Sequence, residues 1–357
     1  MVDPEAPIVG ELDGVAAHEA APRCGGWDWE LDEPEDHGLS SAGLEQLAEV
    51  AEATRSTCVV VIADGELVGE WYWVGFDAAT PIPDLWSVTK SVTSLAVGLA
   101  EADGVLDIHD PVADYLPEWV GTESDEVTIF DLLTHTSGRE WDFASDFAIL
   151  GAADQTAYAL GFGQALPPGT RFDYSNLGVQ TLEAVLEAAI GEDVGDYIEA
   201  RLFAPLGMDA SLARDPSGNP LLYTGLSTTC RDLARLGHMV ESGGRWRWRR
   251  VVPKAWIAEA TTPATDLNHA NGLLWWLDGP GHVVLPSTPA RLEYDGKLLP
   301  SGSDDAFMAL GAFGQLIYVD RERELVLVRA TLDYDMGDPL ALGDMDAIVG
   351  ALVAAEL

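Results

Sequence analysis

Lysine is scarce in this chain, with only three among 357 residues, at positions 90, 254 and 297. Sixteen arginines provide the rest of the positive charge, and a guanidinium group stays protonated in proteins and cannot act as a base. With the arginines included, the chain has 19 basic and 60 acidic residues, which gives a formal net charge of -41. A charge of this size repels nucleic acid and anionic membranes, so we expect neither as a partner.

The acidic residues are spread through segments that also carry apolar periodicity, so they indicate a solvated shell around a folded core. With 47% hydrophobic residues, a chain of this length can bury a large core. Self-repulsion within the shell is screened when the Debye length falls to roughly 3 Å near 1 M salt. We therefore hypothesise that the protein is halophilic, as proteins of an acidic proteome are.

Cysteine is rare as well. Cys24, Cys58 and Cys230 are an odd number at wide spacing, which indicates neither a disulfide framework nor a CxxC metal or redox site. No run approaches the roughly 20 apolar residues of a membrane span, and no basic region followed by an apolar one opens the sequence. We therefore expect a reducing, cytoplasmic setting.

The sequence also lacks GxSxG, HExxH and any Cys/His cluster with metal-ligand spacing, so we expect no metal and no cofactor.

Apolar periodicity divides the chain into strands at both ends and helices between them. Residues 40–54 have helical spacing and begin with a serine that favours an N-cap. Two strands flank the Asp64-Gly65 dipeptide, which favours the turn of a β-hairpin. Three further strands lie far downstream, before an apolar helix at the end of the sequence. We predict an α+β fold, with an antiparallel sheet flanked by terminal helices and an inserted, mostly helical domain.

The predicted organisation begins with an irregular acidic segment at residues 1–37. Residues 38–86 and 225–357 form the α/β domain with the sheet, and residues 87–224 form the mostly helical domain. We expect the active site in the crevice between these two domains, which is a favoured place for a site. We expect a monomer or a homodimer.

The stretch SVTK holds Ser87 and Lys90, and no other lysine has a serine three residues before it. Residues at i and i+3 lie one above the other on a helix face, so the amine can reach the hydroxyl. Apolar neighbours would desolvate the lysine, lower its pKa and make a neutral amine available as a general base. The alternative is an N-cap serine followed by a solvated lysine, and the motif alone favours that alternative.

A second signal comes from Tyr174 and Asn176, which form the only Tyr-x-Asn in the chain, just before a strongly apolar helix. A tyrosine beside an ammonium group can relay a proton, and an amide can hold both a lysine and a substrate carbonyl. The alternative is that Ser175 or Asn176 only caps the helix.

Three further features could belong to a substrate site. Gly311 interrupts an apolar strand pattern and permits close backbone approach, although a glycine here is also typical of a simple bulge. The N–H groups of Ala312 and Ser87 could then form an oxyanion hole. Trp275 and Trp276 could wall an acyl pocket, or they could belong to the core.

These motifs resemble those of the serine β-lactamase and penicillin-recognising family, specifically its class C-like branch, which includes esterases, D-amino-acid peptidases and 6-aminohexanoate-dimer hydrolases. SVTK is similar to the family's Ser-x-x-Lys, and YSN to its Tyr-x-Asn. Stretches such as DLLTHTSG and VVPKAWI also look typical of the branch, in the expected order, from about Leu39 to the C-terminus. The resemblance implies an acyl-enzyme on Ser87, proton transfer by Lys90 and Tyr174, and Asn176 in the same network. Such chemistry needs no imidazole, so we interpret His135 as a turn residue packed behind the site.

The third motif of the family has an unusual form here. Its Lys-Thr-Gly or His-x-Gly is replaced by Ala309-Leu310-Gly311, and Ala309 cannot pair with the carboxylate of a penicillin or a peptide C-terminus. We therefore predict a serine hydrolase that acts on small-molecule carboxylic esters or small linear amides, similar to 6-aminohexanoate oligomers. The alternatives are β-lactamase or D-amino-acid peptidase activity, and a non-catalytic binding protein of the same fold.

One short stretch contrasts with the acidic composition. RWRWRR, at residues 245–250, interleaves arginine and tryptophan as nucleic-acid-binding patches do. The net charge argues against that function, and we interpret the stretch as a surface hairpin with internal ion pairs.

Overall fold

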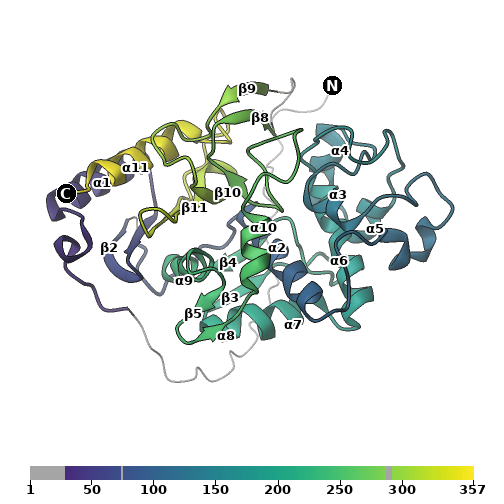
Figure 1. Cartoon of the computed structure of the whole chain (residues 1–357), viewed down its shortest axis with the longest axis horizontal. Coiled ribbons are helices and arrows are strands. Elements are labelled where there is room, and N and C mark those ends of the chain that lie inside the picture. The colour runs from purple at the N-terminus through teal and green to yellow at the C-terminus, as the bar shows by residue number, and fades with distance from the viewer. Residues whose placement is uncertain (1–28, 74, 287–291) are drawn as a thin grey trace.

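The computed structural model of the chain describes residues 29–73, 75–286 and 292–357 (Figure 1). Most of the predicted irregular segment at residues 1–37, and Cys24 with it, lies outside the described residues. The part of this segment that the structure describes includes one short 3-10 helix, η1 (Pro34–His37).

A six-stranded sheet, whose neighbouring strands all run antiparallel, forms the centre of the fold. The order of its strands is β2 (Glu66–Tyr72), β1 (Cys58–Ala63), β12 (Leu325–Ala330), β11 (Gln315–Asp320), β10 (Phe307–Gly311) and β7 (Trp276–Leu277). The turn between β1 and β2 has positive φ at both Asp64 and Gly65, 52° and 84°, as a type I′ turn requires. The predicted hairpin and downstream strands are confirmed.

Both faces of the sheet are buried, because successive residues of each strand enter different cores. In β1, Val60 and Ile62 belong to one hydrophobic cluster, whereas Val59 and Val61 belong to the other. Helices α2 (Val88–Ala102) and α9 (Cys230–Glu241) pack on the first face. Helices α1 (Ser41–Ala53) and α11 (Leu342–Ala354) pair on the second face, as Figure 1 shows. The Ser40 hydroxyl accepts the N–H of Gly43 at 3.0 Å, so α1 begins with the predicted N-cap.

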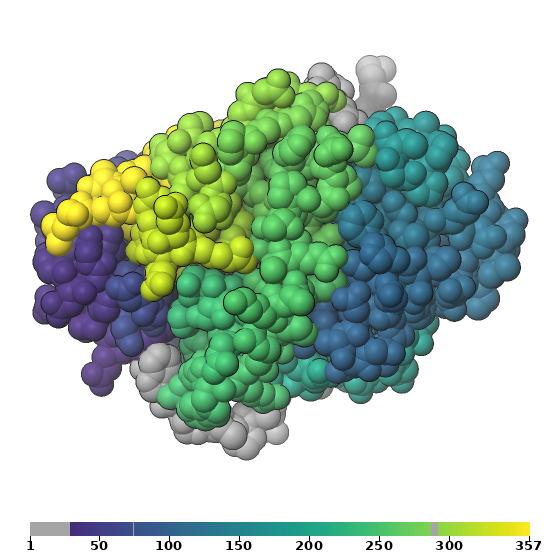
Figure 2. Space-filling model, in the orientation of Figure 1, coloured from purple at the N-terminus to yellow at the C-terminus, as the bar shows by residue number. Residues whose placement is uncertain are grey.

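Between the two groups of strands the chain is mostly helical. Its helices are α3 (Ile129–Leu133), α4 (Phe143–Ala148), α5 (Gln155–Leu160), α6 (Asn176–Ile190), α7 (Val194–Ile198) and α8 (Ala204–Leu206), with the shorter turns η2 (Val112–Asp114), η3 (Pro117–Trp119), η4 (Ile149–Gly151) and η5 (Glu199–Phe203). In the space-filling view of Figure 2 this part of the chain, in blue and teal, occupies one end of the molecule. The fold is of the predicted α+β class, with an antiparallel sheet, terminal helices and an inserted helical part. No helix in the described part of the chain is long and apolar enough to span a bilayer.

Three small strand pairs and one helix complete the structure. They are β3 (Ala210–Leu212) with β4 (Leu226–Thr228), β5 (Arg245–Trp246) with β6 (Arg249–Arg250), β8 (Gly281–Leu285) with β9 (Leu292–Gly296), and α10 (Lys254–Ala260). The arginine- and tryptophan-rich stretch is thus a surface hairpin, as predicted. Its Trp246 packs edge-on against Trp29, with ring centroids 5.6 Å apart, whereas Trp248 is 79% exposed.

Two of the cysteines are paired, contrary to the sequence-based expectation. Cys58 of β1 and Cys230, the first residue of α9, form a disulfide with their Cα atoms 6.5 Å apart. They are separated by 172 residues, so their pairing follows only from the way α9 crosses the sheet. The expectation of unpaired cysteines was wrong, and the argument for a reducing compartment loses its basis.

Candidate active site

Ser87 follows a tight turn that a half-buried carboxylate holds in place. The Oδ1 atom of Asp84 accepts the N–H of Trp86 at 2.7 Å and the N–H of Gly225 at 3.0 Å. Trp86 has a left-handed backbone, with φ of 51°, and Ser87 then stands at the N-cap position of α2. The Ser87 side chain makes no capping hydrogen bond there. Its hydroxyl is therefore not a simple N-cap and is free for chemistry at the positive end of the helix.

Lys90 is buried, with 2% of its surface exposed, and its amine has three hydrogen-bond partners. Its Nζ lies 2.8 Å from Ser87 Oγ, 2.7 Å from Asn176 Oδ1 and 2.9 Å from the carbonyl oxygen of Tyr223. Burial lowers the pKa of Lys90 to about 7, although the carboxylates of Asp146 and Asp84 act in the opposite direction. The alternative of a solvated surface lysine does not hold.

Tyr174 meets the same hydroxyl from another side. Its phenol is close enough to Ser87 for the two side chains to interact, and Lys90 Nζ lies 5.0 Å from the centroid of its ring. Burial raises the pKa of the Tyr174 phenol well above its ordinary value. The phenol thus stays protonated at neutral pH, so it can relay a proton between its neighbours but is not a standing base.

The start of α6 places Asn176 beside Lys90. Ser175 is the N-cap of this helix, and its Oγ accepts the N–H of Gly178 at 3.0 Å. The capping alternative is therefore right for Ser175, whereas the Asn176 side chain accepts a hydrogen bond from Lys90. Asp146 of α4 supports this end of α6, since its Oδ1 accepts from Ser175 Oγ at 3.1 Å and from Leu177 N–H at 3.2 Å. Burial raises the pKa of Asp146, which lies close enough to Lys90 to interact with its charge.

Gly311 ends β10 directly against the segment that leads into Ser87. A Cβ atom at this position would lie 2.3 Å from the carbonyl oxygen of Leu85, so only glycine permits the contact. Ala312 opens the turn η6 (Ala312–Gly314), in which Phe313 has φ of 65°. The Phe313 ring meets the Trp86 ring with centroids 5.2 Å apart. The turn that carries Ala312 is thus packed on the residue before Ser87, and the oxyanion hole stays a prediction.

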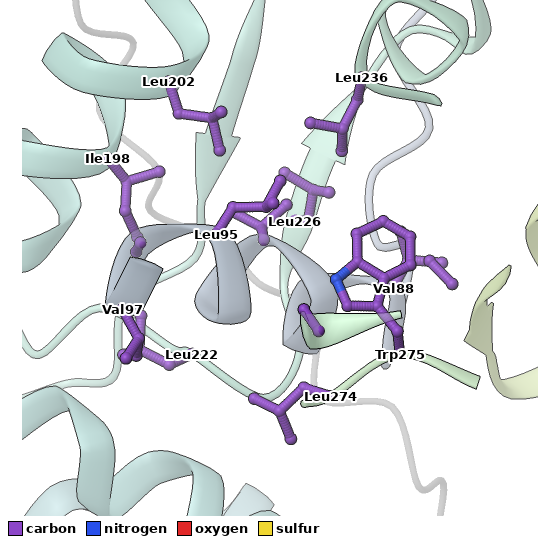
Figure 3. Close-up of a cluster of buried hydrophobic side chains, with 14 of the residues drawn as sticks. Val88, Leu95, Val97, Ile198, Leu202, Leu222, Leu226, Leu236, Leu274 and Trp275 are labelled. Atoms are coloured by element: carbon purple, nitrogen blue, oxygen red, sulfur yellow. The ribbon is translucent and has the colours of Figure 1, made fainter. Parts of the chain in front are cut away.

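The two adjacent tryptophans point to different faces of the sheet. Trp276 stacks on Tyr174, with ring centroids 5.7 Å apart and planes at 25°. Trp275 is completely buried in the core against Phe307, and Figure 3 shows its ring beside Val88 of α2. The expectation that Trp275 walls a pocket is corrected, because its side chain enters the core on the α2 face, whereas Trp276, the first residue of β7, belongs to the cluster on the other face. Ala309 is also fully buried on the α2 face.

Sequence reasoning missed the groups that surround the motif residues. The carbonyl of Tyr223 and the carboxylate of Asp146 come from segments far from Lys90 in sequence, and no local pattern marks them. Asp84 lies close to Lys90 in sequence, but its hydrogen bond to Trp86 shapes the turn before Ser87. His135 lies behind Tyr174, as expected. No group of three or more His, Cys, Asp or Glu side chains in the described ranges could hold a metal ion.

A serine at a helix start, a buried lysine bonded to it and a tyrosine at the same hydroxyl define a serine-type hydrolase site on a β-lactamase-like scaffold. The model of the Beta-lactamase family matches residues 44–341, and the chain belongs to this family.

Known proteins agree with this assignment. The chain is 28% identical over 243 residues to a 6-aminohexanoate-dimer hydrolase of Paenarthrobacter ureafaciens, an alignment that covers 60% of this chain and 59% of that protein. It is 26% identical over 216 residues to a β-lactamase of Pseudomonas fluorescens, covering 59% of this chain and 52% of that one. The chain thus spans less than two thirds of the length of these two relatives. A penicillin-binding protein homologue of Caulobacter crescentus has the same fold, with a TM-score of 0.68, 18% identity and coverage of 89% and 99%.

Proposed function

We propose that the protein cleaves carboxylic esters or small linear amides through an acyl-enzyme on Ser87. The observation that carries this proposal is the 2.8 Å contact between Ser87 Oγ and a Lys90 amine whose pKa burial lowers to about 7. A neutral Lys90 takes the proton of Ser87 as Oγ bonds to the substrate carbonyl carbon. The leaving alcohol or amine departs with a proton relayed by Tyr174 and Lys90. Water then attacks the acyl-enzyme, releases the acid and restores the serine.

The third motif supports a substrate without a carboxylate next to the scissile bond. Ala309 is fully buried and carries no charge, and the next side chain, Leu310, is apolar and half-buried beside the cluster that includes Tyr174 and Trp276. Nothing on this part of β10 can pair with a substrate carboxylate, as penicillins and peptide C-termini require. The similarity to a 6-aminohexanoate-dimer hydrolase supports a linear amide as one substrate class.

Active-site labelling and turnover test the nucleophile. In high salt, we expect the wild-type protein to react with a fluorophosphonate probe and to hydrolyse a short p-nitrophenyl ester, and Ser87→Ala to do neither. Ser94→Ala is a matched control, because Ser94 is buried on the same helix and its Oγ has no hydrogen-bond partner among the described residues. Absent labelling together with equal, background turnover by wild type and Ser87→Ala would leave a non-catalytic binding protein.

The second candidate activity is β-lactam hydrolysis, which the similarity to a β-lactamase of Pseudomonas fluorescens supports. We expect a chromogenic cephalosporin to be cleaved far more slowly than the best ester, because residues 309–311 of β10 carry no cation for its carboxylate. Cleavage as fast as that of the best ester would overturn the substrate class, while leaving Ser87 as the nucleophile.

A further inference from the structure

His135 contacts the chain on both sides of Tyr174. Its backbone carbonyl accepts the N–H of Asp173 at 2.8 Å, and its Nδ1 accepts the N–H of Ser175 at 3.2 Å. Asp173 and Ser175 are the residues directly before and after Tyr174, so one residue fixes both neighbouring peptide units. His135 itself sits in a left-handed turn after α3, with φ of 59°, and is 3% exposed.

The His135 imidazole also packs against the Tyr174 ring. The His135 and Tyr174 rings have centroids 4.6 Å apart, and Trp276 stacks on Tyr174 at 5.7 Å. Tyr174 is thus held by two aromatic neighbours, by the backbone contacts of His135 and by Ser87 at its hydroxyl.

The imidazole can make this contact only when it is neutral. Because Nδ1 accepts the N–H of Ser175, the ring proton lies on Nε2. Burial and the nearby charge of Lys90 lower the pKa of His135 to about 3, so the ring stays neutral across the working range of a hydrolase. The groups that face it from neighbouring elements are the cation of Lys90, the phenol of Tyr174 and the apolar ring of Phe172.

We propose that His135 is a positioning residue for the proton relay, which fixes the Tyr174 hydroxyl at Ser87 by holding the peptide units on either side of it. This inference rests on the proposed function. Its physical basis is that proton transfer needs the donor and acceptor within hydrogen-bond distance, and a displacement of about 1 Å can cost about a hundredfold in rate. His135 touches no reacting atom, so its effect must pass through Tyr174.

The test compares two substitutions that both tolerate a left-handed backbone. His135→Asn keeps an acceptor at the place of Nδ1, whereas His135→Gly keeps the backbone freedom and loses the acceptor and the ring. We expect His135→Gly to lower kcat for a p-nitrophenyl ester at least about tenfold with KM changed less than about twofold, and His135→Asn to stay within about threefold of wild type.

A double-mutant cycle with Tyr174→Phe separates positioning from general damage. If His135 acts only through the Tyr174 hydroxyl, His135→Gly should cause no further loss of kcat once that hydroxyl is gone. Full persistence of the loss in the Tyr174→Phe background would overturn the inference, and so would a His135→Gly variant as active as wild type. If His135→Gly does not fold, His135→Asn still provides a test. A kcat of His135→Asn as low as that of Tyr174→Phe would overturn the inference. Failure of the proposed function looks different, since Ser87→Ala would then be as active as wild type.

Discussion

At the scale of single residues, the fold makes Lys90 a usable base by taking its amine out of water. All three of its partners are neutral oxygens, from Ser87, Asn176 and Tyr223. The two carboxylates near it, Asp84 and Asp146, are themselves bound to backbone N–H groups and form no direct ion pair with it in the described structure. The cost of burying a charge here therefore outweighs the attraction of the acids, and the neutral amine is accessible at ordinary pH.

Activity should depend on pH as the deprotonation of Lys90 does. Since burial lowers the pKa of Lys90 to about 7, the fraction of neutral amine rises with pH through that value. We expect kcat/KM for a neutral ester to rise about tenfold per unit below pH 7 and to level off above it. Initial rates between pH 5.5 and 8.5 measure this profile.

Two arginine variants provide the controls. Lys90→Arg should abolish activity because a guanidinium group does not deprotonate, and Lys254→Arg, at an exposed position of α10, should leave it unchanged. A flat profile over this range, or an active Lys90→Arg enzyme, would show that another group is the base.

The contact at Gly311 gives a second prediction. In Gly311→Ala, the new Cβ would meet the Leu85 carbonyl at 2.3 Å, so β10 or the turn before Ser87 must move. We expect a loss of about 1–3 kcal/mol in the free energy of unfolding and a fall in kcat of about tenfold or more. Urea denaturation and ester kinetics measure the two effects.

Gly343→Ala is the matched control for this change. Gly343 lies in α11 with a negative φ, and a Cβ there would meet nothing within 4 Å. Alanine at that position should be neutral or slightly stabilising. Equal behaviour of the two variants would contradict the argument from close approach.

The residues of the motif could be predicted because their spacing or uniqueness is visible in the sequence. Ser87 and Lys90 stand one helical turn apart, and Tyr174 and Asn176 form a single motif before α6. Asp146 could not be predicted, because its contacts with the start of α6 depend on how segments distant in sequence fold together. The burial of Trp275 could not be predicted either, because it lies just before the two-residue strand β7 and no local pattern fixes its side.

At the scale of elements, local chemistry predicted the boundaries well. Ser40 caps α1, Asp64 and Gly65 make the turn between β1 and β2, and Ser175 caps α6. What local chemistry could not predict is how elements cross, and the disulfide between β1 and α9 depends on that crossing. It fastens the helix to the sheet face that also carries α2.

Reduction of this disulfide should weaken the protein. A loop closed over 172 residues restricts the unfolded chain strongly, so we expect a loss of about 2–5 kcal/mol in the free energy of unfolding. Denaturation with and without dithiothreitol measures it. The double variant Cys58→Ala/Cys230→Ala should resemble the reduced protein and should not respond to the reductant. An unchanged wild-type midpoint in dithiothreitol would contradict the expectation.

At the scale of the whole molecule, the net charge of -41 is the dominant feature. We propose that the acidic surface is an adaptation to high salt, because repulsion among exposed carboxylates opposes the compact state until ions screen it. The arginine-rich hairpin at residues 245–250 gathers four of the sixteen arginines at one place, so it relieves this repulsion only locally.

Salt should therefore stabilise the fold. Between 0.1 M and 1 M NaCl the Debye length falls from about 10 Å to about 3 Å, and we expect the thermal midpoint to rise by at least about 5 °C. Differential scanning calorimetry measures the shift. Substitution of three exposed glutamates close in sequence, Glu118, Glu123 and Glu126, by glutamine should raise the midpoint at low salt and leave it unchanged at 1 M. A midpoint that is constant or falls with salt would refute the adaptation.

The order of the strands has a consequence for how the protein is made. β1 and β2 leave the ribosome long before β12, with which β1 also pairs. Until β12 emerges, the β1 edge of this apolar hairpin is unpaired, and such an edge invites pairing with other chains. Ser87, Lys90 and Tyr174 emerge long before β10 and its turn can be placed beside them. A chain that stops before β10 would thus be an aggregation-prone and inactive product, and not a weakened enzyme.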